Sequence, residues 1–127
     1  MDVTPLIAQG QQIIQSYSGG VFKVSGQLYD QSVFVMPDVT HIWSYDADEV
    51  NAFSVDDFHL LINQAEQVDV FLLGTGKHMA MLSSSLRAEL RSAGISLDCM
   101  DTGAACRTYN VLMAEGRRVG CALMPYV

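Results

Sequence analysis

The sequence predicts a mixed α/β (α+β) domain, because its first part has the patterns of β-strands and its second part alternates helices with strands. Up to about residue 53, short apolar runs are separated by glycine and proline turns, as in antiparallel sheets. Beyond that point, segments of helical periodicity alternate with continuous apolar runs. Half of the 127 residues are hydrophobic, which is enough for one buried core. We therefore expect a single domain over residues 1–127, with a βαβαβ unit in its C-terminal half.

The first part is expected to contribute antiparallel strands that extend or cover a sheet. Its apolar runs are predicted as strands at residues 13–17, 21–24, 28–29, 32–36 and 41–45. A hairpin joins the second and third of these runs, because Ser25-Gly26-Gln27 suits a turn. Side chains alternate along a strand, so His41, Trp43 and Tyr45 should share one face of the last run.

The second part is expected to fold as α-β-α-β-α-β, with parallel strands and right-handed crossovers. Its predicted elements are a helix after Ser54, a strand at 70–73, a helix through Leu82, Leu86 and Leu90, a strand at 95–100, a helix from Thr102 to Glu115 and a strand at 119–124. Ser54 and Asp57 resemble a capping box, and Gly94 suits the left-handed position after a helix. The helix from Thr102 is apolar nearly all round, which is typical of a helix buried between layers.

The composition argues against several classes of protein. A net charge of −7 disfavours non-specific binding to nucleic acid. No apolar run approaches the about 18 residues of a membrane helix, and Met1 to Gln15 carries Asp2 with no basic residue ahead of its apolar positions, unlike a targeting segment. We therefore expect a cytoplasmic protein without membrane insertion. Three cysteines without CxxC spacing argue against a disulfide scaffold, and no cluster has metal-ligand spacing, so we expect no metal and no cofactor.

The first candidate site is Gly74-Thr75-Gly76, directly after the strand predicted at 70–73. A glycine-rich turn between a strand and a helix can hold a phosphate group on its backbone N–H groups. The dinucleotide fingerprint would need a third glycine where this chain has Met79, and Lys77 comes too early for a phosphate-binding loop. We favour the other interpretation, in which both glycines permit a tight turn and close packing.

The second candidate site is the segment that contains Asp101, Thr102, Cys106 and Arg107, where a strand passes into a helix. Unpaired N–H groups at a helix start attract anions and can lower the pKa of a nearby thiol. A nucleophilic cysteine also needs a base, and the sequence places no histidine beside Cys106. We favour a structural interpretation, in which Thr102 caps the helix, Cys106 is shielded, and Arg107 pairs with Asp101 or Asp98.

Two weaker candidates have ordinary structural explanations. The stripe formed by His41, Trp43 and Tyr45 could be an interaction surface or a ligand wall, but large rings more often pack in a core. Arg117-Arg118 follows the helix-ending Gly116, where cations stabilise a helix C-terminus and could also receive an acidic partner.

The stretch from Met100 to Pro125, MDTGAACRTYNVLMAEGRRVGCALMP, resembles the C-terminal signature of a small single-domain family of unknown function. That family was first known from an archaeal protein, and its eukaryotic members include the mitochondrial NADH dehydrogenase (complex I) assembly factor 3 and an adipogenesis-associated protein. Other segments fit the same family: residues 14–18, 22–26, 32–37 and 70–76, and Trp43. The resemblance covers about residues 12–125.

This resemblance implies a three-layer domain with a mixed sheet, a smaller β layer on one side and helices on the other. It carries no catalytic residue across to this chain. The assembly-factor branch acts by binding other proteins during the biogenesis of respiratory complexes, and a chain without a targeting segment resembles a bacterial relative. We therefore expect a non-catalytic protein-binding or assembly module whose partners are respiratory-complex subunits or assembly factors.

Two further expectations concern association and ligands. High apolar content in a small domain leaves apolar surface for a partner, so we expect a homodimer. The alternative function is a small-molecule or nucleotide-binding protein, or an enzyme, with its site at Gly74–Gly76 and Asp101–Arg107. That position is the usual crevice at the strand ends of parallel α/β units.

Overall fold

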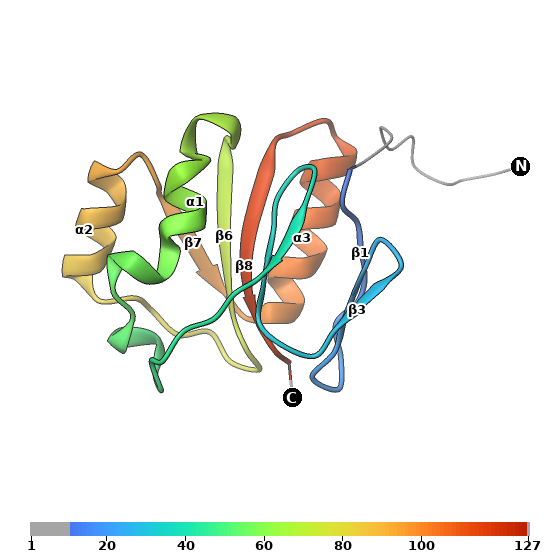
Figure 1. Ribbon diagram of the computed structural model, residues 1–127, viewed down its shortest axis with the longest axis horizontal. Helices are drawn as coiled ribbons and strands as arrows, with labels where there is room; N and C mark the ends of the chain where they lie inside the picture. Colours follow the sequence, from blue (N-terminus) through green and yellow to red (C-terminus); the bar gives the residue numbers. More distant parts are fainter. Residues whose placement is uncertain (1–10, 127) are drawn as a thin grey trace, which may run out of the picture.

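A computed structural model describes residues 11–126 of the chain. Its strands are β1 (Ile14–Ser16), β2 (Phe22–Val24), β3 (Gln27–Tyr29), β4 (Val33–Val35), β5 (Thr40–Ile42), β6 (Val70–Thr75), β7 (Leu97–Met100) and β8 (Val119–Met124). Its helices are α1 (His59–Asn63), α2 (Ser84–Ser92) and α3 (Thr102–Ala114), with short 3-10 turns at Val50–Ala52, Val55–Phe58 and Ala65–Gln67 (Figure 1). This order confirms the mixed α/β class and the C-terminal βαβαβ unit.

The strands form two sheets. β1, β2 and β3 make a three-stranded antiparallel sheet, and the other five make a mixed sheet in the order β5-β4-β8-β6-β7. In the larger sheet β6 is parallel to both β7 and β8, while β4 is antiparallel to β8 and to β5. β7 and β8 lie on opposite sides of β6, and their crossover helices α2 and α3 lie on opposite faces of the sheet. The two crossovers therefore have the same hand, as the right-handed rule requires.

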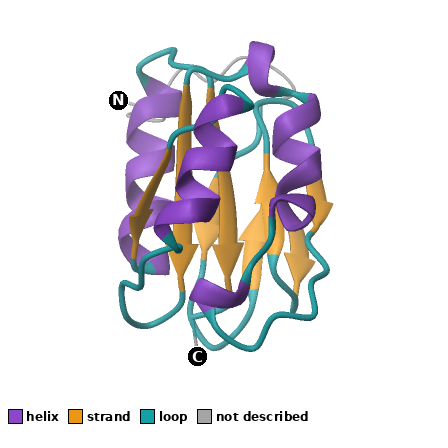
Figure 2. Cartoon of the chain, turned by 90° about the vertical axis from the view of Figure 1, so that its left-hand side faces the viewer, coloured by secondary structure: helices purple, strands orange, loops and turns teal. Residues whose placement is uncertain are grey.

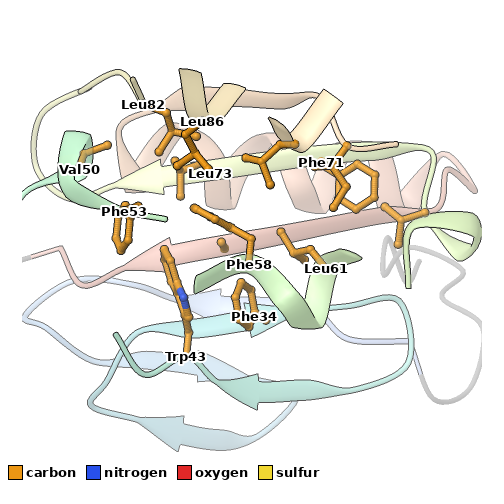
Figure 3. Packing of buried hydrophobic residues seen from close by; sticks show 14 of the residues in the cluster. Phe34, Trp43, Val50, Phe53, Phe58, Leu61, Phe71, Leu73, Leu82 and Leu86 are labelled. Carbon is orange, nitrogen blue, oxygen red and sulfur yellow. The ribbon is translucent and has the colours of Figure 1, made fainter. Parts of the chain in front are cut away.

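One face of the larger sheet is covered by α1, α2 and the 3-10 turns (Figure 2). Alternate side chains of β4, β6 and β8 point to this face, including Phe34, Phe71 and Leu73. Trp43 lies between Phe34 and Phe53, with ring centroids 5.0 Å and 5.1 Å away (Figure 3). Close-packed aromatic and aliphatic groups of this kind supply most of the free energy that holds a small domain together.

The opposite face of the larger sheet carries both the three-stranded sheet and α3. The hydrophobic core on this face contains side chains of the three-stranded sheet (the small sheet), such as Phe22, together with Leu72 of β6 and Tyr109 of α3. Asn110 of α3 also accepts a hydrogen bond from the Ile14 N–H at 3.0 Å and donates one to the Ile14 carbonyl at 2.7 Å. The β layer that the resemblance implies is therefore present, and α3 shares its side of the sheet.

Several predicted element boundaries were wrong. α2 begins at Ser84, after Leu82, and β7 begins at Leu97 and not at residue 95. Two further differences concern the candidate sites. β6 continues to Thr75, so Gly74 lies inside a strand and does not begin a turn. β5 ends at Ile42, so Trp43 and Tyr45 lie beyond the strand that was expected to carry them. In both cases pairing with neighbouring strands fixed the boundary, because β6 is held between β7 and β8 up to Gly74, whereas β5 pairs only with the three residues of β4.

Candidate functional site

The ends of β6 and β8 meet at Thr102, the first residue of α3. The Thr102 hydroxyl accepts a hydrogen bond from the Gly76 N–H at 2.7 Å and donates one to the Met124 carbonyl at 2.7 Å. The Thr102 N–H donates in turn to the Gly76 carbonyl at 2.8 Å. Thr102 has no exposed surface. The structure thus brings Gly76 and Thr102 together, and the hydroxyl of Thr102 joins the ends of two strands, β6 and β8.

Gly74 permits this close approach of strand and helix. A Cβ atom at Gly74 would lie 2.9 Å from the Thr102 Cα and 3.0 Å from a methyl carbon of Leu123. Gly76 has a different reason to be glycine, since its φ of +94° belongs to the left-handed region. Both glycines therefore serve backbone geometry, as predicted, although only Gly76 lies after the strand.

Thr75, between the two glycines, organises the loop that follows. Its hydroxyl donates to the His78 carbonyl at 2.7 Å and accepts from the Ala80 N–H at 3.0 Å. These bonds fold residues 76–80 back over the end of β6. The backbone groups around Gly74-Thr75-Gly76 are thus engaged by neighbouring residues of the same chain.

The helix cap is one residue earlier than predicted. Asp101 is the N-cap of α3, and its carboxylate accepts from the Ala104 N–H at 2.9 Å. The prediction that Thr102 caps the helix was wrong, because β7 ends at Met100 and Asp101 alone keeps an extended backbone before the helix. Thr102 takes the first helical position, and its side chain points into the domain instead.

Cys106 lies one turn into α3 and is buried against the sheet. Burial raises the pKa of the Cys106 thiol to about 12, while nearby Arg107 lowers it and Asp101 raises it by smaller amounts. Burial also raises the pKa of the Cys121 thiol well above its usual range. Both thiols are therefore protonated at neutral pH, and the helix start does not activate Cys106.

The predicted pairing of Arg107 with Asp101 or Asp98 was wrong. Arg107 donates from Nη1 to the Tyr17 hydroxyl at 2.7 Å, and within residues 11–126 the one ion pair joins Arg118 to Asp69. Gly103 makes room for this contact, since a Cβ there would lie 3.1 Å from both the Arg107 Nη1 and the Tyr17 ring. The Asp101 carboxylate is occupied as the cap, and Tyr17 is 90 residues away in sequence, so no local pattern could show the contact.

The two weaker candidates serve structure. Trp43 is buried, its ring lies 4.6 Å from that of Tyr45, and its indole N–H donates to the Asp57 carbonyl at 2.8 Å, which confirms a packing role. Arg118 binds the Asp69 carboxylate with two nitrogens, at 2.7 Å and 3.1 Å. This hydrogen-bonded pair lowers the pKa of Asp69, and it lies on the exposed surface.

A cavity that the sequence did not indicate lies between α2 and β7, at the edge of the larger sheet. Its volume is about 370 Å³, and it is lined by Met81, Arg87, Leu90, Arg91, Ser96, Leu97, Asp98 and Cys99. The buried Nε of Arg87 has no hydrogen-bond partner in the described part of the chain. One sequence signal could have indicated it. Arg87 and Arg91 are four residues apart, which places them on the same side of a helix, and the strand that follows contains Cys99.

Cys99 is the most accessible of the three thiols, because it is only half-buried in this cavity. Burial raises its pKa, whereas a hydrogen bond from the Leu82 backbone and the charge of Arg87 lower it, and the charge of Asp98 raises it. Residues 11–126 contain no group of three histidine, cysteine or carboxylate side chains that could hold a metal ion.

Comparison with known proteins identifies the family. The chain belongs to the family described as "Protein of unknown function (DUF498/DUF598)", which it matches over residues 14–124. An uncharacterized protein of Rhodobacter capsulatus is 35% identical over 112 residues, which is 88% of this chain and 83% of the relative. NADH dehydrogenase [ubiquinone] 1 alpha subcomplex assembly factor 3 of Danio rerio is 31% identical over 93% of this chain and 67% of its own length. The human assembly factor 3 is 29% identical, and the match spans 60% of its length.

Solved structures share the fold. A structure described as an outer membrane protein from Bartonella henselae superposes with a TM-score of 0.80 at 31% identity, over 93% of this chain and 98% of that one. A protein from Bordetella parapertussis gives the same TM-score at 29% identity and the same coverage. In the present chain, no helix among the described residues is both long enough and apolar enough to span a bilayer.

Proposed function

We propose that this protein is a non-catalytic protein-binding module that takes part in the assembly of a respiratory NADH dehydrogenase. The observation that carries this proposal is the 31% identity to an assembly factor of that complex over 93% of the chain. The partners would be subunits of the complex or other assembly factors. Fold alone does not imply a function, so a direct test is needed.

The chemistry around Thr102 supports binding over catalysis. An anion at the start of α3 would need free backbone N–H groups, but the Ala104 N–H is bonded to Asp101 and the Gly76 N–H is bonded to Thr102. A nucleophile would need an accessible thiolate, but Cys106 is buried with a raised pKa. The alternative hypothesis is a small-molecule site at Gly74–Gly76 and Asp101–Arg107. These contacts leave few free groups there that could bind a ligand.

An apolar surface for a partner is available beside these strand ends. The loop between β6 and α2 exposes Met79 by 57% and Met81 by 47%. Methionine is flexible and polarizable, and surfaces that bind protein partners often use it. We infer that this pair of side chains, the Met79–Met81 surface, is where the protein contacts a partner or a second copy of itself.

The cytoplasm is the compartment we propose for this module. Support comes from its three cysteines, all of which are free in the structure, as thiols are in a reducing compartment. The relatives described as membrane proteins make this worth testing, by fractionation of cells that express a tagged chain. Recovery of the tagged chain with membranes after a high-salt wash would contradict the proposal.

The function is tested by deleting the gene in its native host and resolving the respiratory complexes on a native gel. We expect less assembled NADH dehydrogenase, with the other respiratory complexes unchanged. A plasmid copy should restore assembly, whereas a copy carrying Met79→Glu and Met81→Glu should restore less. A copy carrying Leu28→Glu, at an exposed site in the small sheet, is the matched control. Normal levels of the complex in the deletion strain would refute the proposal.

A further inference from the structure

The cavity between α2 and β7 has an unbalanced charge. Arg87 and Arg91 lie one helical turn apart on α2, so both can face the same opening. The one acidic group in the lining is Asp98, which is exposed and forms no ion pair with either arginine. The opening therefore presents two cationic groups against one anionic group.

Arg87 is the less solvated of the two arginines. It is half-buried, its Nε is closed off from solvent, and within residues 11–126 that atom has no acceptor. Removing a guanidinium nitrogen from water without an acceptor costs free energy, and buried polar groups in folded proteins are almost always paired. An anion in the cavity would bind the remaining nitrogens of this poorly solvated guanidinium, whose planar fork matches a carboxylate.

Hydrocarbon groups form part of the lining, beside the Ser96 hydroxyl and the Cys99 thiol. Leu90 is almost fully buried at the cavity, and Leu97 and Met81 contribute further hydrocarbon surface. The volume of about 370 Å³ is at the small end of the range for ligand sites, which are mostly apolar with a few polar groups that fix orientation. The lining thus suits a small molecule with one anionic end and one short apolar end.

We propose that this cavity binds a small carboxylic acid with a short aliphatic chain, with the carboxylate held by Arg87 and Arg91 and the chain against Leu90 and Leu97. The site adjoins the Met79–Met81 surface, with which it shares Met81, and goes beyond the assembly role proposed above. It gives the domain a ligand of its own, bound at the open edge of the larger sheet.

The test is an NMR titration of the isotope-labelled protein with sodium hexanoate at constant ionic strength. Acetate carries the charge without the chain, and 1-hexanol carries the chain without the charge. We expect hexanoate to produce saturable shifts in the amide signals of residues 87–91 and 96–99, at concentrations where the other two probes do not. Hexanoate should also slow the alkylation of Cys99, which lines the same cavity. Equal binding of hexanoate and hexanol, or shifts elsewhere on the molecule, would overturn the proposal.

Variants assign the binding to the arginines. Arg87→Gln should weaken hexanoate binding by about tenfold or more, since hydrogen bonds to charged groups are the strong ones. Arg118→Gln is the control, because this arginine is outside the cavity and pairs with Asp69. If Arg87→Gln lowers the melting temperature, Arg87→Lys provides a second test, since it keeps the charge and loses the planar fork. Unchanged affinity in the folded Arg87 variant would refute the assignment.

Discussion

At the scale of single residues, the structure depends on Thr102. Its hydroxyl satisfies the Gly76 N–H and the Met124 carbonyl in a place that water does not reach. Buried backbone groups without partners are costly, so a side chain that satisfies two of them contributes more than its own contact area. Thr102 therefore stabilises the domain through its hydroxyl and through its position beside Gly74.

Thr102→Val tests this role, because valine keeps the shape and removes the hydroxyl. We expect the free energy of unfolding to fall by about 3 kcal/mol, since two buried groups lose their partner. Thr102→Ser keeps the hydroxyl and removes one methyl group, and it should cost about 1 kcal/mol. Urea denaturation measures both values. If Thr102→Val lowers the free energy of unfolding less than Thr102→Ser, the hydroxyl is not what stabilises the domain.

The three thiols provide a second residue-scale prediction. In the native protein at neutral pH, iodoacetamide should label Cys99 first, because Cys106 and Cys121 are buried and have raised pKa values. Cys99→Ser should then leave almost no labelling until the protein is denatured. Mass spectrometry of peptides identifies the labelled positions. Rapid labelling of Cys106 would instead make a redox or nucleophilic role the leading hypothesis.

At the scale of elements, β6 and α3 pack closely at Gly74, which has the least room for a Cβ atom among the described glycines. An added Cβ at Gly74 meets a backbone atom of Thr102 at 2.9 Å, and a backbone atom cannot move aside cheaply. An added Cβ at Gly120, in β8, meets the Met36 Sδ at 3.3 Å, in the outer part of a flexible side chain. The two positions are both strand glycines of the same sheet and differ in what surrounds them.

Gly74→Ala should therefore lower the free energy of unfolding by about 3 kcal/mol, through overpacking that separates β6 from α3. Gly120→Ala is the matched control and should cost about 1 kcal/mol or less, because Met36 can change rotamer. Thermal and chemical denaturation measure both. Similar losses for the two variants would show that the cost comes from the strand in general and not from the helix contact.

α3 also predicts how stability depends on pH. It buries the Cys106 thiol, with a pKa of about 12, and the Tyr109 hydroxyl, whose pKa burial also raises. In the unfolded chain the thiol ionises near pH 9, so between about pH 9 and 12 the folded state holds a proton that the unfolded state has lost. The contribution of Cys106 to stability is full below pH 9 and should fall above it by about 1.4 kcal/mol per pH unit, and that of Tyr109 should fall in the same way above about pH 10.

Melting temperatures recorded from pH 7 to 11 measure this loss. Cys106→Ala removes one of the groups, so its melting temperature should fall less steeply above pH 9, whatever its value at pH 7. Cys99→Ala, at the half-buried thiol, is the control and should change the slope less. A slope that is the same in both variants and in the unchanged chain would contradict the burial of Cys106 as the cause.

Local sequence patterns predicted most elements and missed what depends on tertiary contact. The spacing of leucines identified α2, a cap followed by apolar residues up to Gly116 identified α3, and the apolar runs identified the strands, because each element has apolar side chains to bury. The cap at Asp101 was missed by one residue, since both Asp101 and Thr102 are good caps and only the end of β7 decides between them. The contact between Arg107 and Tyr17 and the cavity at Arg87 join segments that the sequence leaves unconnected.

At the scale of the whole molecule, the two faces of the larger sheet are closed. α1 and α2 cover one face, and the small sheet with α3 covers the other. What remains for association is the surface outside these layers, where residues 11–126 expose six large hydrophobic side chains: Leu28, Val39, Ile42, Met79, Met81 and Val111. Single exposed apolar side chains are ordinary, but Met79 and Met81 are both exposed, two residues apart on one short loop, and we propose that they form an apolar patch.

We expect this patch to mediate the homodimer that the composition predicts. Analytical ultracentrifugation should show a dimer that dissociates on dilution, because two methionines per copy bury less apolar area than a permanent interface. The double variant Met79→Glu, Met81→Glu should weaken the dimer by about a hundredfold or more, since like charges would then face each other across a two-fold interface. Leu28→Glu adds a charge at a 70% exposed site in β3 and should leave the dimer unchanged. A monomer at high micromolar concentration would rule out the dimer and leave the Met79–Met81 surface to a different partner.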